Sequence, residues 1–207
     1  MKSLGEIKKI SFIIRVRDAE LDLKACLGAL SEQVGIDGIE TEFIVVDNES
    51  KDNSVAVAKS YHAKIITIKQ SEFSWGKALN DGIEIASGDI LIIVSADTIA
   101  ENEYFVAHMV TPFLEDDSVC AVYGRQIPKS DAPLDERVRL KRKFPSQYQV
   151  VDSTNDIDKS GKGTFFSNAC GAIRKSLWIK LHYDEQIPAA EECVWTYEML
   201  QLGYKSV

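Results

Sequence analysis

The sequence lacks long hydrophobic runs and any excess of positive charge. No run approaches the about 20 apolar residues that a membrane-spanning helix needs, and Met1 to Glu6 do not contain the apolar centre of a secretory signal. The 24 basic and 32 acidic residues give a net charge of −8, which argues against a nucleic-acid partner bound mainly through its phosphates. We therefore expect a cytoplasmic protein with no nucleic-acid partner.

Ligand patterns for metals and dinucleotides are also missing. The four cysteines lie far apart with no C-x-x-C pair, and the three histidines have no partner at ligand spacing. This spacing favours reduced, packed thiols over a disulfide or a zinc site. No G-x-G-x-x-G follows the first apolar run, where the turn reads Arg17-Asp-Ala-Glu20, so dinucleotide binding loses its main support.

Short β-branched runs alternate with segments of helical spacing over the first 125 residues. Such runs are typical of buried strands, and their alternation with helices predicts a mostly parallel α/β sheet with helices on both faces. The expected strands are 10–16, 42–46, 64–68, 90–94 and 119–123, and the expected helices are 21–30, 55–61, 78–86 and 105–114. With 207 residues and 45% hydrophobic content, we expect a single domain, 1–207.

Acidic residues follow two of the expected strands at the point where each strand ends. Phe43–Val46 leads directly into Asp47, and Ile90–Val94 leads through Ser95 to Asp97. Ligands of parallel α/β sheets bind just beyond the carboxyl ends of the strands, so two acids at such ends indicate a nucleotide site. Either acid could instead be a helix cap or a turn residue, since Asp and Asn favour these positions.

The periodic pattern fades between residues 124 and 163, where three of the five prolines fall. Long irregular segments in compact domains are usually functional or mobile. Within this one, Arg137 to Lys143 contains five basic residues in seven. A solvated helix face explains this stretch. The alternative is a surface for anionic lipid or a phosphorylated acceptor, which would bring the protein to the inner face of a membrane as a peripheral contact.

Several motifs, taken together, resemble the family 2 glycosyltransferases, in a rhamnosyltransferase-like branch. In chain order they are Ser11–Glu20, Ile44–Ser54, Phe73–Asn80, Ala86–Asp89, Ser95–Asp97, Tyr123–Gln126, Phe165–Asn168 and Glu191–Trp195. The resemblance covers nearly the whole chain. It implies the GT-A fold, a nucleotide-sugar donor, a nucleotide-binding half over about 1–125 and an acceptor-side half over about 126–207. Family members usually continue beyond the equivalent of Val207, which favours a chain truncated at its C-terminus.

The resemblance implies roles for five residues near the donor. Asp47 would bind the base or ribose of the nucleotide, and Arg15 and Asp18 would line the same pocket. Lys77 and Asn80, at the start of the helix after the third strand, would face the nucleotide or the diphosphate.

Further roles follow for the reacting groups. Asp97 matches the last acid of the family's Asp-x-Asp motif, which implies that it holds Mg²⁺ or Mn²⁺ against the diphosphate. Ser95 would line the nucleotide site together with Asp97. It departs from the motif, because it stands in the place of the first acid, and one carboxylate binds a divalent ion more weakly than two. Glu192 matches the catalytic Asp of the family and Glu191 the residue before it, which implies a general base. Without the resemblance, both acids simply complement a helix N-terminus.

We therefore expect an inverting transfer of a sugar from a nucleotide-diphosphate sugar to a hydroxyl of a sugar or lipid-linked acceptor, in polysaccharide or glycolipid assembly. Ser95, the Glu-Glu pair and the early C-terminus favour an alternative, a nucleotide-sugar-binding domain without catalysis. A sugar nucleotidyltransferase is a third reading, weakened because Arg15–Glu20 contains no glycine. The sugar, the nucleotide, the acceptor and the oligomeric state are not indicated by the sequence.

Overall fold

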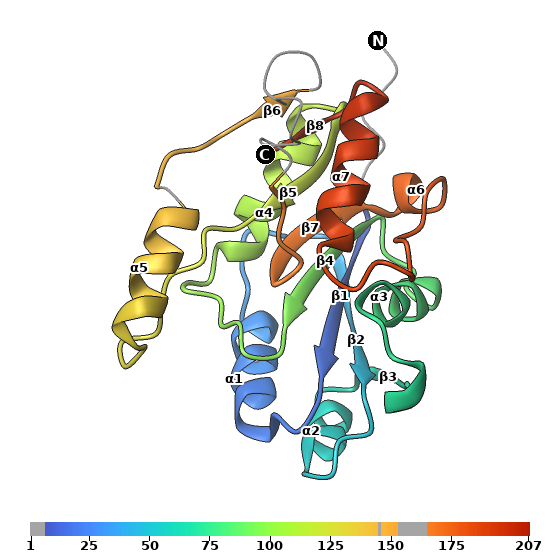
Figure 1. The fold of residues 1–207 in the computed structure, drawn as a ribbon, viewed down its shortest axis with the longest axis vertical. Coiled ribbons are helices and arrows are strands. Elements are labelled where there is room, and N and C mark those ends of the chain that lie inside the picture. The colour runs from blue at the N-terminus through green and yellow to red at the C-terminus, as the bar shows by residue number, and fades with distance from the viewer. Residues whose placement is uncertain (1–6, 145, 153–164) are drawn as a thin grey trace.

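The computed structural model describes residues 7–144, 146–152 and 165–207. Its centre is an eight-stranded sheet with the strand order β3-β2-β1-β4-β7-β5-β8-β6 (Figure 1). The strands are β1 (Lys9–Val16), β2 (Glu40–Asp47), β3 (Lys64–Thr67), β4 (Ile90–Ser95), β5 (Val119–Tyr123), β6 (Val151–Asp152), β7 (Cys170–Arg174) and β8 (Lys205–Ser206). The helices are α1 (Glu20–Ser31), α2 (Ser54–Ser60), η1 (Gln70–Glu72), α3 (Trp75–Glu84), α4 (Phe105–Glu115), α5 (Leu134–Lys143), α6 (Lys175–Trp178) and α7 (Glu191–Gln201).

The first half of the sheet is parallel, as the sequence predicts. β1 pairs in parallel with β2 and with β4, and β2 pairs in parallel with β3. The apolar run Ile90–Val94 is buried along its whole length, as a strand covered on both faces should be. In these ladders Arg15 lies opposite Ser95, and Val16 lies opposite Asp47, so the carboxyl ends of three strands meet at one edge.

Helices cover both faces of the sheet, which confirms the predicted layers. Leu27 of α1 and Phe113 of α4 belong to the apolar cluster on one face, to which α2 also contributes. Leu79 of α3, Trp178 of α6 and Trp195 of α7 belong to the cluster on the other face. The chain thus packs α1, α2 and α4 against one side of the strands and α3, α6 and α7 against the other.

The second half of the sheet is mixed, a detail that the alternating pattern does not predict. β7 runs antiparallel between β4 and β5, and β6 runs antiparallel to β8. β7 contains Gly171, where an added Cβ would lie 2.7 Å from Cζ of Phe166, so a larger residue would displace that ring. The close approach brings the segment before β7 against the sheet at the edge where β4 ends.

The irregular segment after β5 begins at the end of β5 and ends at the start of the neighbouring strand, β7. The amide of Gly124 donates to the carbonyl of Cys170 (2.9 Å), so the chain leaves and returns at one place. Its basic stretch forms α5, which stands at the side of the molecule away from α3 (Figure 1), and residues 153–164 lie outside the described part. Among the described helices, none is both long and apolar enough to span a bilayer.

Arg174, at the end of β7, joins this strand to α4 and β5 at the edge opposite the site. Its guanidinium donates to the carbonyls of Val119 (2.9 Å), Phe113 (2.7 Å) and Asp116 (3.2 Å). We predict that Arg174→Met, by removing these donors, lowers the free energy of unfolding by about 2 kcal/mol. For a domain of this size, that change lowers the midpoint of thermal unfolding by about 4–8 °C. The exposed Lys180→Met is the control, and equal midpoints for the two variants would contradict the prediction.

Candidate active site

The loops after β1 and β2 are tied to each other at the carboxyl edge. The Asp47 carboxylate is buried and accepts from the amide of Ser50 (3.2 Å). The Asp18 carboxylate accepts from the amide of Lys51 (2.6 Å), and the Asp18 amide donates to Oγ of Ser50 (3.0 Å). Asp18 holds a left-handed backbone, φ 48°, which a residue other than glycine rarely adopts. The structure therefore brings Asp18 and Asp47 together, and both carboxylates hold the loop at Ser50 and Lys51.

Arg15 lies on the other face of the sheet from Asp47. Its neighbour across the ladder is Val46, and successive strand residues point to opposite faces. The Arg15 guanidinium lies 4.7 Å from the centre of the Trp75 ring, and its Nη1 lies 3.6 Å from Oε1 of Glu191. Burial lowers the pKa of Arg15, while Glu191 and Glu192 raise it. The structure thus places Arg15 beside the acid pair, whereas the resemblance grouped it with Asp47 and Asp18.

Lys77 lies in the first turn of α3, where the sequence places it. The helix begins after Ser74, whose Oγ accepts from the Lys77 amide (3.1 Å) and so caps the helix. The Lys77 ammonium is partly exposed and lies 2.8 Å from the Asp81 carboxylate, which raises the pKa of Lys77. Lys77 therefore remains charged and sits at the end of α3 nearest the strand ends.

Asn80 is buried, and its amide is fully engaged by the protein. Its Nδ2 donates to the carbonyl of Tyr183 (2.9 Å) and to Oε1 of Glu185 (3.0 Å). Its Oδ1 accepts from Nε1 of Trp178 (3.0 Å) and from the amide of Tyr183 (3.1 Å). No donor or acceptor is left for a nucleotide, so Asn80 fixes the segment between α6 and α7 against α3.

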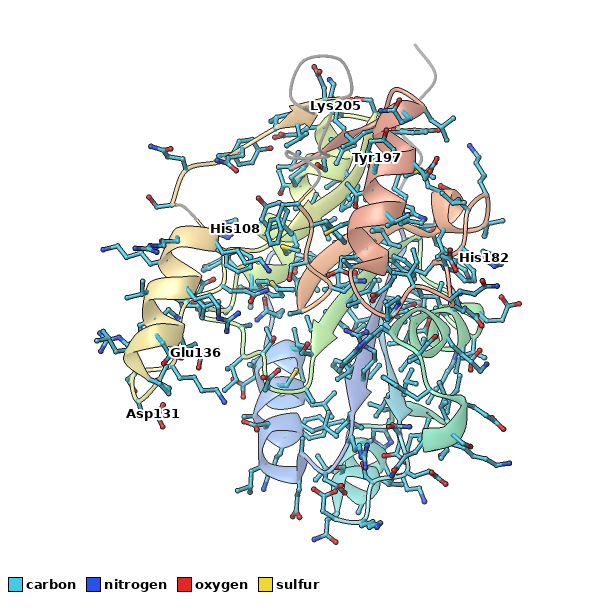
Figure 2. All side chains as sticks on the ribbon, in the orientation of Figure 1. His108, Asp131, Glu136, His182, Tyr197 and Lys205 are labelled. Carbon is cyan, nitrogen blue, oxygen red and sulfur yellow. The ribbon has the colours of Figure 1, made fainter. Side chains whose placement is uncertain are left out.

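Asp97 is exposed just beyond β4. Ser95 and Thr98 both donate to the carbonyl of Ala169, which holds the turn that carries Asp97 against the start of β7. Asp97 and Ser95 line a cavity of about 950 Å³ that extends between α4 and α5. Figure 2 labels His108, Asp131 and Glu136, which line the same cavity from α4, from the segment before α5, and from α5.

The residues around Asp97 fit a divalent ion that is shared with a phosphate ligand. In the described part of the chain, no group of three or more His, Cys, Asp or Glu side chains converges as a metal cage. Mg²⁺ is commonly held by one or two carboxylates together with substrate phosphates and water. The exposed Asp97 carboxylate can supply the protein ligand of such an ion, with Ser95 two residues before it.

Glu191 and Glu192 begin α7, as the sequence predicts. Glu191 is buried, and its Oε1 lies 3.5 Å from Nδ2 of Asn168, which donates to it. Glu192 is half-buried, and burial first and the neighbouring Glu191 second raise its pKa, while Arg15 lowers it. Ala190, just before them, adopts a left-handed backbone with φ 69°. A partly buried carboxylate with a raised pKa can accept a proton from a hydroxyl group.

Three residues of this site are not identified by the sequence. Trp75 and Asn168 lie inside motifs of the resemblance, but those motifs assign them no role. Tyr183 is buried, and its hydroxyl donates to Oδ1 of Asn168 (3.3 Å). It lies between two helices in a stretch without periodicity, so no sequence signal points to it. Burial, with Glu192 and Glu191 close by, raises the pKa of Tyr183 well above its usual value.

Comparisons with known proteins identify the family of this chain. Residues 11–181 match the family described as glycosyl transferase family 2. The O-antigen chain rhamnosyltransferase WbaN of Salmonella anatum is 32% identical over 169 residues, which are 80% of this chain and 53% of that protein. The chain therefore spans about half the length of this relative.

Solved structures share the GT-A fold with this chain. The mannosyltransferase PcManGT from Pyrobaculum calidifontis, solved in complex with GDP-Man and Mn²⁺, has a TM-score of 0.68 at 17% identity and covers 99% of this chain and 55% of its own. The glucosyl-3-phosphoglycerate synthase from Mycobacterium tuberculosis, solved with Mn²⁺, UDP and glucosyl-3-phosphoglycerate, has a TM-score of 0.63 at 19% identity and covers 94% and 67%. These structures show the fold, and the family match over residues 11–181 shows that the chain belongs to glycosyl transferase family 2.

Proposed function

We propose that this chain carries the active site of an inverting glycosyltransferase, which moves a sugar from a nucleotide-diphosphate sugar to an acceptor hydroxyl in polysaccharide or glycolipid assembly. The observation that carries the proposal is the place of Arg15. Arg15 lies opposite Ser95, and Ser95 comes two residues before Asp97 in the chain. Nη1 of Arg15 also lies 3.6 Å from Oε1 of Glu191. The acid at the end of β4 and the acid pair of α7 therefore flank one edge of the sheet. Displacement with inversion needs such groups on both sides of the sugar.

On the donor side, we assign Asp47 to the base or ribose, and Asp18 to holding the loop that covers it. Lys77 is charged and partly exposed, so it can move from Asp81 toward the diphosphate. Asn80 keeps a role in orienting the segment before α7, because its amide is saturated.

We assign Asp97 as the protein ligand of Mg²⁺ or Mn²⁺. The ion would supply positive charge against the negative charge that develops on the departing diphosphate. Asp97 lines the cavity beyond β4, and Lys77, from α3, would add a second positive charge. Mn²⁺ accompanies the nucleotide ligands in both solved structures named above, which supports a divalent ion without identifying it.

On the acceptor side, we assign Glu192 as the general base. Its carboxylate takes the proton of the acceptor hydroxyl while the hydroxyl oxygen forms a bond to the anomeric carbon. The bond from that carbon to the diphosphate oxygen breaks at the same time, and its electron pair leaves with the diphosphate. Attack opposite the leaving group inverts the configuration.

A peripheral membrane contact through α5 is a further part of the proposal. Val138, inside the basic stretch Arg137 to Lys143, is 41% exposed, and Leu134, one helical turn before it, is 74% exposed. Exposed apolar side chains flanked by lysine and arginine are typical of helices that rest on an anionic bilayer. A lipid-linked acceptor would then meet the cavity beside α5.

We predict that Glu192→Gln lowers the rate of transfer by about 10²-fold or more, because the amide cannot take the proton. Donor affinity should stay nearly unchanged, and Glu191→Gln should have the smaller effect. Glu192→Asp, which shortens the side chain by one methylene, should retain or raise activity. Initial rates and donor titrations measure these effects. A parental rate in Glu192→Gln would remove the case for catalysis by this carboxylate, and absence of donor hydrolysis by the parent would favour a binding domain without catalysis.

Asp97→Asn should abolish the tightening of nucleoside diphosphate binding by Mn²⁺, since the amide is a poor ligand for the ion. Calorimetric titrations of GDP, UDP, ADP, CDP and dTDP, each with and without Mn²⁺, measure this effect. The fold should be unaffected because the side chain is exposed, and the midpoint of thermal unfolding checks it. The same Mn²⁺ enhancement in the variant and the parent would contradict the assignment.

Reversing three charges of α5, with Arg137→Glu, Lys141→Glu and Arg142→Glu together, should weaken binding to phosphatidylglycerol vesicles. The difference should fade at high salt, where screening weakens surface attraction. The matched control reverses Lys51, Lys59 and Lys180, which are exposed elsewhere, so that the change in net charge is equal. Equal vesicle binding by the two triple variants would make α5 an ordinary solvated helix.

A further inference from the structure

Arg15 carries two buried nitrogen atoms without a hydrogen-bond partner, Nε and Nη1. Among the described residues, the only other buried side-chain atom in this condition is Oγ of Ser206. An unsatisfied buried donor costs roughly 1–3 kcal/mol, and more when it is charged. An arginine here therefore weakens the fold, which points to a role at the site rather than in the core.

The guanidinium is enclosed by the first residues of two helices. Trp75, the first residue of α3, covers one side with its ring at 4.7 Å. Glu191, the first residue of α7, provides the counter-charge at 3.6 Å. The side chain of Arg15 is 12% exposed and that of Glu191 is 4% exposed, so water screens the pair weakly. Arg15 thus links the end of β1 to the beginnings of α3 and α7.

The contacts continue from Glu191 into a buried polar network. Glu191 accepts from Asn168, Asn168 accepts from the Tyr183 hydroxyl, and the backbone of Tyr183 is held by Asn80 of α3. Each side chain has its direction fixed by the next one. The left-handed backbone of Ala190, just before Glu191, shows that these tertiary contacts outweigh the local preference of the chain.

We propose that Arg15 is a positioning residue for the transfer, which fixes the N-terminus of α7 through Glu191 so that Glu192 faces the edge where β1 and β4 end. The proposal rests on the proposed function. It replaces a direct contact between Arg15 and the nucleotide, because Arg15 points to the opposite face from Asp47 and lies under Trp75. Glu191 and Glu192 are adjacent in the chain, so an anchor on the first limits the directions open to the second.

The pH dependence of transfer distinguishes this role from a purely structural one. The titratable groups that interact with Glu191 and Glu192 are Arg15 from β1, Tyr183 from the segment before α7, and Cys193 from α7 itself. The charge of Arg15 lowers the pKa of Glu192, and the charge of Glu191 raises it. The acid limb of the rate profile is the rise in transfer rate with pH as Glu192 loses its proton. Removing Arg15 therefore moves this limb to higher pH. Removing the charge of Glu191 moves it to lower pH.

The test compares Arg15→Met, Arg15→Lys, Glu191→Gln and the double variant Arg15→Met with Glu191→Gln. We expect Arg15→Met to lower kcat by about 10-fold, since small misplacements of reacting groups slow the chemical step. Its dissociation constant for the tightest of GDP, UDP, ADP, CDP and dTDP should change by less than about two-fold. Arg15→Lys should restore the position of the acid limb and part of kcat. The double variant should lose no more kcat than Arg15→Met alone, because coupled residues are not additive.

Arg174→Met is the control for damage to the fold, because Arg174 is a partly buried arginine at the opposite edge of the sheet. It should lower the unfolding midpoint without moving the acid limb. A 10-fold loss of nucleoside diphosphate affinity in Arg15→Met at parental kcat would overturn the proposal, and so would multiplicative losses in the double variant. If Arg15→Met does not fold, Arg15→Lys and Glu191→Gln still test it, and equal acid limbs in these two would overturn it.

Failure of the proposed function is a separate result. If the parent transfers no sugar, or if Glu192→Gln transfers at the parental rate, the function fails. The link between Arg15 and Glu191 is then measured by the unfolding midpoints of the single variants Arg15→Lys and Glu191→Gln and of the variant that combines them. Additive changes in these midpoints would remove the link itself, whatever the chain catalyses.

Discussion

The parallel register of β1 with β2 and β4 determines where each polar side chain of the site can lie. Because the three strands end at one edge, Asp47, Ser95 and Arg15 occupy neighbouring positions in the sheet, although they lie far apart in the sequence. Alternation along β1 then sends Arg15 toward α3 and α7, whereas Asp47 turns to its own loop. One set of strand pairings thus separates Asp47, which we assign to the nucleotide, from Arg15, which contacts Glu191.

Sequence reasoning succeeded where a signal was local. The run Ile90–Val94 is apolar at every position because both of its faces are covered, and this fixed β4 and the place of Asp97 after it. The two acids of α7 were placed at a helix N-terminus because apolar residues with helical spacing, Val194, Tyr197 and Leu200, follow them. The contacts of Asn80 could not be read in this way, because a polar residue early in a helix resembles a surface position until Tyr183 is folded onto it. β7 was missed because its five residues, with glycine in second place, are too short a stretch to show the alternation of a strand.

The features that destabilise the fold are concentrated at the site. A buried guanidinium and a buried carboxylate both lose hydration, and a separation of 3.6 Å between Nη1 and Oε1 recovers only part of that loss. Asp18 and Ala190 add backbone conformations that their residue types disfavour. These costs lie at one end of the sheet, while the opposite end is tied by the three hydrogen bonds of Arg174. The stabilising hydrogen bonds of Arg174 therefore lie at the end of the sheet away from the groups that we assign to chemistry.

The hydrogen bond between Gly124 and Cys170 closes a loop on the sheet at the point where β5 and β7 begin to separate. The entropy cost of closing a loop grows only slowly with its length, so insertions around α5 disturb the pairing of β4, β5 and β7 little. The helix α5 and one wall of the cavity belong to this loop. The part of the cavity wall that contains α5 can consequently change in length or charge while Asp47, Asp97 and the acid pair keep their positions in the fold.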